Sequence, residues 1–173
     1  MTKVITGKVR FSYVNVWTPK AIEGSTNEPK YSVSIIISKD DTKTLNAVKK
    51  AIEDAKSEYT TRFGGKAPAN LKTPLRDGDI ERPEDAAYAN SYFINANSTH
   101  KPGIVDADVN PILDQDEFYS GCYGRASIDI HPYNSNGNKG VRAELNNLQK
   151  LEDGERLSGK ASAADDFGSG LLD

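Results

Sequence analysis

The chain has few of the residues on which metal, thiol or disulfide chemistry depends. Its 173 residues include one cysteine, one tryptophan, one methionine and two histidines. The single cysteine, Cys122, excludes an internal disulfide and fits a reducing compartment. No apolar run approaches the roughly 18 residues of a membrane-spanning helix, and no apolar signal-peptide core follows Met1. We therefore expect a protein that stays in the cytoplasm where it is made and has no membrane partner.

The residues that could form an active site are sparse as well. His100 and His131 each stand alone at a predicted strand end, which is typical of surface histidines. Cys122 falls within a strand pattern and has no neighbouring histidine, so core packing is its expected role. The sequence Gly64-Gly65-Lys66 lacks the remaining residues of a phosphate-binding loop. We expect no catalysis, no metal site and no cofactor.

Clustered carboxylates support the main alternative, a magnesium-dependent nuclease or resolvase. Such an enzyme would hold metal ions between acidic side chains. The candidates are Asp77, Asp79 and Glu81 in one cluster and Asp106 and Asp108 in another. A turn stabilised by aspartate and glycine explains the first cluster adequately, and a solvated loop explains the second. A non-enzymatic virion or assembly protein is a third possibility.

The charges are distributed unevenly, although the net charge is only -3. Residues 1–76 carry +7 and residues 77–117 carry -8, whereas residues 118–151 carry +2 and residues 152–173 carry -4. A basic first half beside an acidic tail suggests a body that binds a polyanion. The segment 1–151 has a net charge of only +1. Binding therefore requires the cations of residues 1–76 and of the last hairpin to share one groove, with the carboxylates of 77–117 elsewhere.

Alternating apolar residues predict five strands. The first is long and curved, with a break or bulge at Gly7. The last two form a hairpin whose turn carries the Asn136-Gly137 signal. The predicted strands are Val4–Val16, Lys30–Ile37, Ser91–Asn97, Gly121–His131 and Gly140–Leu148. The segment Gly103–Asp106 is a candidate continuation of the third strand.

One helix is expected between the second and third strands. A capping-box-like start at Ser38–Asp41 precedes apolar residues at helical spacing as far as about Tyr59. Glycine and proline punctuate the long connection that follows, residues 64–87, where short helical turns fit the pattern and a strand does not.

This order of elements predicts a mainly β fold: a five-stranded Greek-key barrel of the OB type with one main helix and long irregular connections. The helix follows the second strand, whereas the common OB arrangement places it after the third. The binding domain is expected to span residues 1–151. Residues 152–173 have the small and acidic composition of a flexible, disordered tail.

Cations and aromatic residues are interleaved along the predicted strands. Binding a single nucleic-acid strand without sequence preference requires cations along the phosphates and flat rings on which bases stack. Aromatic residues in strands are often core, and we expect about half of these to be so. Trp17, Tyr31 and Tyr133 lie at strand ends and are the preferred stacking candidates. The full set of candidate nucleic-acid-binding residues is Arg10, Tyr13, Trp17, Lys30, Tyr31, Tyr92, Lys101, Arg125, Tyr133, Lys139 and Arg142.

Several short motifs resemble single-stranded-DNA-binding proteins of tailed phages, a family first catalogued as a domain of unknown function. They run in order along almost the whole chain. They are Arg10–Tyr13, Pro29–Ser32, Ser38–Asp41, Pro74–Asp79, Lys101–Gly103, Tyr119–Ala126 and Asn138–Val141. The resemblance implies an OB fold, sequence-independent binding of single-stranded DNA and a role in phage DNA replication or recombination.

The end of the chain is similar in kind to the acidic tails of bacterial and phage single-strand binders. That similarity implies recruitment of phage or host replication proteins, such as a polymerase or helicase. The candidate residues are Asp165, Asp166, Phe167, Leu171, Leu172 and Asp173. An inert, solubilising tail is the alternative. The sequence leaves the oligomeric state open, with a homodimer possible.

Overall fold

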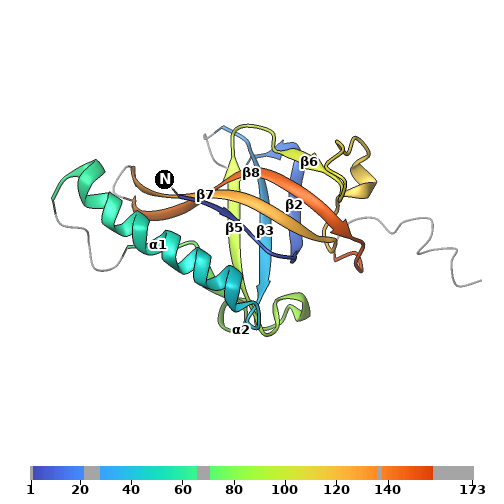
Figure 1. Cartoon of the computed structure of the whole chain (residues 1–173), viewed down its shortest axis with the longest axis horizontal. Helices are drawn as coiled ribbons and strands as arrows, with labels where there is room; N and C mark the ends of the chain where they lie inside the picture. Colours follow the sequence, from blue (N-terminus) through green and yellow to red (C-terminus); the bar gives the residue numbers. More distant parts are fainter. Residues whose placement is uncertain (1, 22–27, 66–70, 136–137, 158–173) are drawn as a thin grey trace, which may run out of the picture.

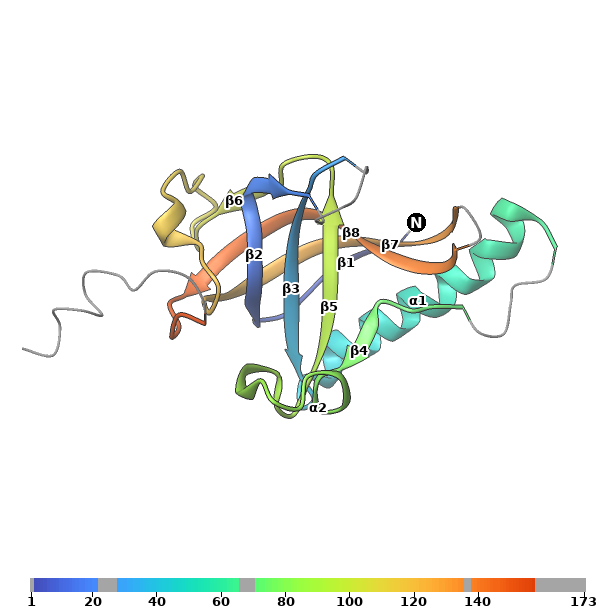
Figure 2. The same cartoon turned by 180° about the vertical axis from the view of Figure 1, so that it is seen from behind.

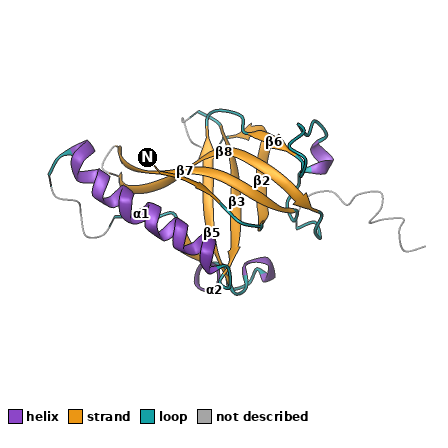
Figure 3. Cartoon of the chain, in the orientation of Figure 1, coloured by secondary structure: helices purple, strands orange, loops and turns teal. Residues whose placement is uncertain are grey.

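The computed structural model describes residues 2–21, 28–65, 71–135 and 138–157. Eight strands and one long helix make up most of this part of the chain (Figures 1 and 3). In chain order the elements are β1 (Thr2–Ile5), β2 (Val9–Lys20), β3 (Lys30–Ser38), α1 (Thr42–Phe63), β4 (Leu75–Asp77), α2 (Gly78–Glu81), η1 (Ala86–Tyr88), β5 (Ser91–Ser98), β6 (Gly103–Val105), η2 (Gln115–Glu117), β7 (Tyr123–Ser135) and β8 (Asn138–Glu152). Among the described residues, no helix is long and apolar enough to span a bilayer.

Five of the strands close into a ring. β2 pairs with β3, β3 with β5, β8 with β7, and β7 with β2, all antiparallel. β5 and β8 complete the ring through a parallel contact between Asn97 and Glu144. The ring members correspond to the five predicted strands, so the mainly β barrel with one main helix is confirmed.

Alternation along β3 explains how the barrel acquires its core. Val33, Ile35 and Ile37 are fully or almost fully buried and pack inside the barrel. Successive strand residues point to opposite faces of a sheet, so Ser32 and Ser34 lie on the outer face. The neighbouring strand β5 repeats this alternation, although part of the outer face is also apolar, because Ile36 and Phe93 form a small second cluster there.

The long helix covers one side of the barrel. Its N-terminus is capped by Asp41, whose side chain accepts a hydrogen bond from the Thr44 N–H at 3.2 Å. The buried face includes Leu45, Val48 and Ile52, and α1 packs against β1 and β7 (Figure 1). The helix is therefore where the sequence predicts it, although it continues about one turn beyond Tyr59, to Phe63.

Two local expectations differ from the structure, and a third, the break at Gly7, agrees with it. The connection 64–87, where no strand was expected, contains β4, because Leu75–Asp77 pairs with the exposed edge of β5. Gly103–Val105 does not prolong β5 and forms a separate strand, β6, parallel to β8. The first predicted strand is divided into β1 and β2 at Gly7, whose N–H binds the Thr44 hydroxyl at 3.0 Å.

The last hairpin is longer than predicted. β7 and β8 pair from Tyr123 and Glu152 up to Ser135 and Asn138. The Asn136-Gly137 turn lies outside the described residues, and so do the tail residues 158–173. Residues just after β8 contact the barrel, since the Leu157 N–H donates to the Ser120 carbonyl at 3.0 Å.

Candidate nucleic-acid interface

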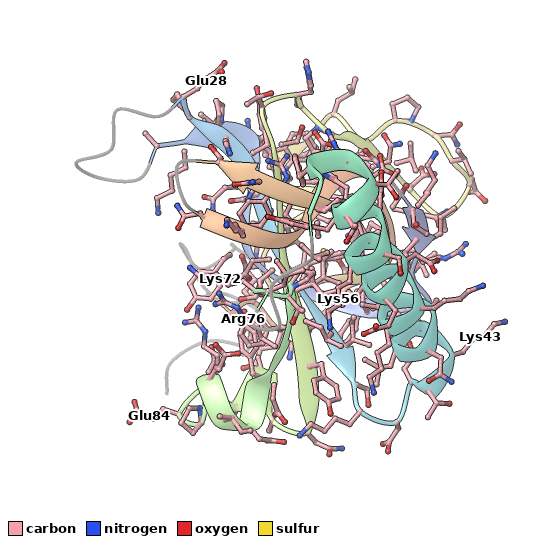
Figure 4. All side chains as sticks on the ribbon, turned by 90° about the vertical axis from the view of Figure 1, so that its left-hand side faces the viewer. Glu28, Lys43, Lys56, Lys72, Arg76 and Glu84 are labelled. Atoms are coloured by element: carbon pink, nitrogen blue, oxygen red, sulfur yellow. The ribbon has the colours of Figure 1, made fainter. Side chains whose placement is uncertain are left out.

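A hollow of about 320 Å³ lies between the β7–β8 hairpin and the edge of the sheet formed by β4 and β5. We call it the hairpin groove. Figure 4 shows two of its cationic residues, Lys72 and Arg76, below the end of this hairpin. The groove is lined by Lys30, Lys72, Thr73, Pro74, Arg76, Asn95, Asn97, Tyr133, Val141, Arg142 and Ala143.

A backbone contact fixes one end of the groove. The Val141 N–H donates to the Lys72 carbonyl at 2.7 Å, and Lys72 forms a bridge with Gly140. A Cβ atom at Gly140 would lie 2.7 Å from the Lys72 carbonyl oxygen and 3.0 Å from Cε1 of Tyr133. Glycine is therefore needed for the segment before β4 and the Tyr133 ring to approach the hairpin this closely.

The groove gathers positive charge without a carboxylate in its lining. Its cations come from residues 1–76 and from the last hairpin, as the predicted segregation of charge requires. Two of them have carboxylates nearby: Arg76 lies 3.8 Å from Glu81, and Arg142 lies 3.8 Å from Glu144. Lys30 and Lys72 have no ion pair with a carboxylate of the described residues. Such a surface attracts a polyanion.

The floor of the groove is polar because of the alternation in β5. Asn95 and Asn97 point outward into the groove, whereas Ile94 and Ala96, which alternate with them, are fully buried in the core. A side-chain amide both donates and accepts hydrogen bonds. The floor can therefore bind base edges, sugars or phosphates.

Three predicted binding residues meet in the hairpin groove: Lys30, Tyr133 and Arg142. The sequence prediction did not include two of the groove cations, Lys72 and Arg76. It also did not include Asn95 and Asn97, which form the floor of the groove. Asn95 and Asn97 alternate with buried residues of the predicted third strand, and this pattern was the signal for an outward polar pair. Lys72 precedes β4 and Arg76 lies in it, and the local sequence does not indicate this strand.

Several other predicted binding residues have partners within the protein. The Arg10 side chain donates to the Gly121 and Glu155 carbonyls at 3.1 and 2.9 Å. Arg125 donates to the Thr6 carbonyl at 2.9 Å. These bonds hold strand ends together.

The predicted aromatic residues outside the groove are spread over the barrel. Tyr92 is half-buried, with Lys39 and Lys49 over its ring, and Tyr31 lies on the face of β3 opposite Lys30. The Trp17 Nε1–H donates to the Phe118 carbonyl at 3.0 Å, while the Lys101 ammonium lies 5.3 Å from the ring centroid.

The remaining two predicted residues are solvent-exposed. Tyr13 lies on β2 with 51% of its surface exposed, and Lys139 lies near the start of β8. DNA binding by the predicted residues outside the groove stays a prediction.

The first carboxylate cluster is occupied by a lysine. The Lys39 ammonium lies 3.0 Å from Asp77 and 2.7 Å from Asp79, and these hydrogen bonds raise the pKa of Lys39 to about 12. The same bond to Lys39, followed by one from the Asn90 N–H, lowers the pKa of Asp79. These carboxylates thus stabilise the start of α2, which Asp77 caps, and the turn before β5, where Asp79 accepts from the Asn90 N–H.

The second cluster forms a turn, because Asp106 accepts hydrogen bonds from the N–H groups of Asp108 and Asn110. Across the described part of the chain, no three His, Cys, Asp or Glu side chains gather as metal ligands would. The geometry offers no support for the nuclease alternative.

Two residues considered for chemistry are buried. Cys122 is fully buried in the core, as expected, and burial raises the pKa of its thiol. The expectation of a surface position for His131 was wrong, since only 12% of its side chain is exposed and its Nε2 lies 3.6 Å from Glu144. The register of β7 and β8 brings this pair together, because His131 lies opposite Arg142 and Glu144 is two residues further along β8 on the same face.

Solved structures of phage proteins resemble this fold. The single-stranded DNA-binding protein from bacteriophage Enc34, in complex with single-stranded DNA, matches with a TM-score of 0.82 at 22% identity over 90% of this chain and 89% of that chain. The gp2.5 single-stranded DNA-binding protein of bacteriophage T7 matches with a TM-score of 0.65 at 13% identity, over 94% and 98% of the two chains.

Sequence comparison extends the likeness to nearly the whole chain. The putative protein p50 of Acyrthosiphon pisum secondary endosymbiont phage 1 is 28% identical over 172 residues, covering 94% of this chain and 90% of that protein. The family model described as "Enterobacter phage Enc34, ssDNA-binding protein" matches residues 2–173. Members of such a family are binding proteins and not enzymes. The chain therefore belongs to the family of the Enterobacter phage Enc34 single-stranded DNA-binding protein.

Proposed function

We propose that this protein binds single-stranded DNA without sequence preference and that the hairpin groove is its main contact. The observation that carries the proposal is the convergence of four cations and one tyrosine on a groove that has no carboxylate in its lining. The family match and the fold shared with proteins named for single-stranded DNA binding support it.

The chemistry of the lining favours sequence-independent binding. Lys and Arg contact phosphates, which are the same for every base. Stacking on Tyr133 suits any base, because every base has a π face. The amides of Asn95 and Asn97 can reverse their donor and acceptor roles for different base edges.

Affinity is expected to fall steeply with salt. If each of the four groove cations holds one phosphate, log K should fall with log salt at a slope of roughly -3, since each contact on a single strand contributes about -0.7. Lys72→Ala should reduce the slope by about 0.7, with affinities measured by fluorescence anisotropy on an oligothymidine at several salt concentrations. The matched control is Lys43→Ala, at an exposed position of α1 away from the groove lining (Figure 4). Binding that is indifferent to salt would rule the proposal out.

We propose further that the protein acts in phage DNA replication or recombination in the cytoplasm of the bacterial host. In this proposal the acidic end of the chain recruits a replication protein through Asp165, Asp166, Phe167, Leu171, Leu172 and Asp173. The phage origin of the family and the composition of these residues support this role. A homodimer remains a prediction.

Deleting residues 161–173 is expected to tighten DNA binding, because an anionic segment tethered to the same barrel competes with phosphate for the cationic groove. The same deletion should abolish capture of a phage or host polymerase or helicase. Anisotropy and a pull-down with the purified partner measure the two effects. A truncated protein that behaves like the full chain in both assays would exclude this role.

A further inference from the structure

Tyr13 presents its ring to solvent from an unfavourable backbone conformation. Its φ is +47°, a value that bulky side chains rarely adopt. The pairing of β2 with β3 shifts between Ser12 and Asn15, so Tyr13 lies in an irregularity of the kind that re-aims a side chain. The side chain is 51% exposed. Strained backbone positions cluster at functional sites, ligand-binding sites among them.

A cation lies over this exposed ring. The Arg82 guanidinium is 5.3 Å from the centroid of Tyr13 and also lies over the rings of Tyr88 and Phe93, at 5.7 and 5.8 Å. Tyr88 is itself fixed, since it is fully buried and its hydroxyl bonds to Ser34 at 2.8 Å. No carboxylate of the described residues forms an ion pair with Arg82. Its charge is held in place and is available to a phosphate.

Uncharged polar side chains connect this pair with the hairpin groove across the outer face of the sheet. Asn97, at the groove, is the partner of Ser32 on β3, and Ser32 is the partner of Asn15 on β2. The Asn15 amide donates to the Tyr13 carbonyl at 3.1 Å and lies 3.5 Å from the Ser32 hydroxyl. We call Asn97, Ser32 and Asn15 the polar strip.

The polar strip crosses three strands that lie side by side in Figure 2, with the β7–β8 hairpin projecting beyond one of their edges. Two strand spacings correspond to roughly 10 Å. The strip contains amides and hydroxyls and no carboxylate, so its residues do not repel a phosphate chain. It has a cation and an aromatic ring at each end: Arg142 and Tyr133 in the groove, and Arg82, which follows α2, over Tyr13 of β2.

We propose that the bound strand continues from the hairpin groove along the polar strip to a second stacking station at Tyr13 and Arg82. There a base stacks on the Tyr13 ring and a phosphate pairs with Arg82. This inference rests on the proposed function and adds the direction of the strand, across β5, β3 and β2. It also assigns binding roles to Arg82, Asn15 and Ser32.

The test compares two lengths of oligothymidine with the full-length protein. Single-strand sites on one OB fold range from about 4 to 16 nucleotides, so an oligomer of about 4 nucleotides can occupy the groove alone, and one of about 12 can reach Tyr13. We expect Tyr13→Asn to weaken binding of the longer oligomer about 5-fold or more, the effect of losing one stack, and to leave the shorter one unchanged. Because asparagine tolerates positive φ, the melting temperature should stay the same or rise.

Control variants separate this inference from the proposed function. Tyr133→Ala should weaken both oligomers, and Leu113→Ala, which alters an 88% exposed apolar residue between β6 and β7, should affect neither. If Tyr13→Asn leaves the longer oligomer unaffected while Tyr133→Ala weakens both, the second station is excluded and the groove stands. Equal weakening of both lengths by Tyr13→Asn, or a lowered melting temperature, would also overturn the inference, since Tyr13 would then support the fold.

Discussion

Replacing Tyr133 with alanine is expected to weaken binding of single-stranded DNA by about 5- to 150-fold. This range corresponds to the roughly 1–3 kcal/mol that one base–aromatic stack contributes. The effect should be large because Tyr133 is the aromatic residue in the lining of the hairpin groove, where it lies beside Gly140. Equilibrium titration of a labelled oligothymidine at fixed salt measures it.

Two further measurements define how Tyr133 acts. Tyr133→Phe keeps the ring and should retain most of the affinity, whereas a hydrogen-bonding role for the hydroxyl would make phenylalanine as damaging as alanine. The salt dependence of Tyr133→Ala should match that of the wild type, because no phosphate contact is removed. If Tyr133→Ala binds as tightly as the wild type, Tyr133 does not stack on a base.

Replacing Gly124 with alanine is expected to lower the free energy of unfolding by about 3 kcal/mol, the upper part of the usual range for overpacking. Gly124 lies where the barrel closes, paired with Val9 on β2 and with Lys150 on β8. A Cβ atom there would overlap the carbonyl oxygen of Gln149, a backbone atom that cannot move without disturbing the β7–β8 pairing. For a chain of this size the melting temperature should fall by roughly 10 °C.

Thermal and urea unfolding followed by circular dichroism measure this loss. The matched control is Ser127→Ala, a half-exposed position on the same strand, which should shift the melting temperature by no more than a degree or two. If Gly124→Ala is as stable as the control, the closed ring of five strands tolerates a wider separation of β7 and β8 than the structure has.

The barrel was predictable because its signals are local. Alternation defined the five ring strands, and Asp41 with the apolar residues after it defined α1. The short strands were not predictable, since Leu75–Asp77 becomes a strand only through the free edge of β5, and no local pattern specifies that edge.

The candidate interface was predictable in part for the same reason. Lys30, Tyr133 and Arg142 converge on the hairpin groove, whereas Arg10 and Arg125 turn to backbone carbonyls of distant segments. Cations and tyrosines look alike in a sequence whether they face DNA or tie two strand ends together. Only the closure of the barrel distinguishes the two roles.

The alternation in β5 links the stability of the protein to its binding surface. Ile94 and Ala96 belong to the core, and Asn95 and Asn97, between and beside them, form the floor of the groove. Inserting or deleting one residue in β5 would exchange the two sets, placing amides inside the barrel and apolar groups on the floor of the groove. Changes in chain length can therefore accumulate in the connections of this protein, whereas this strand can change only by substitution.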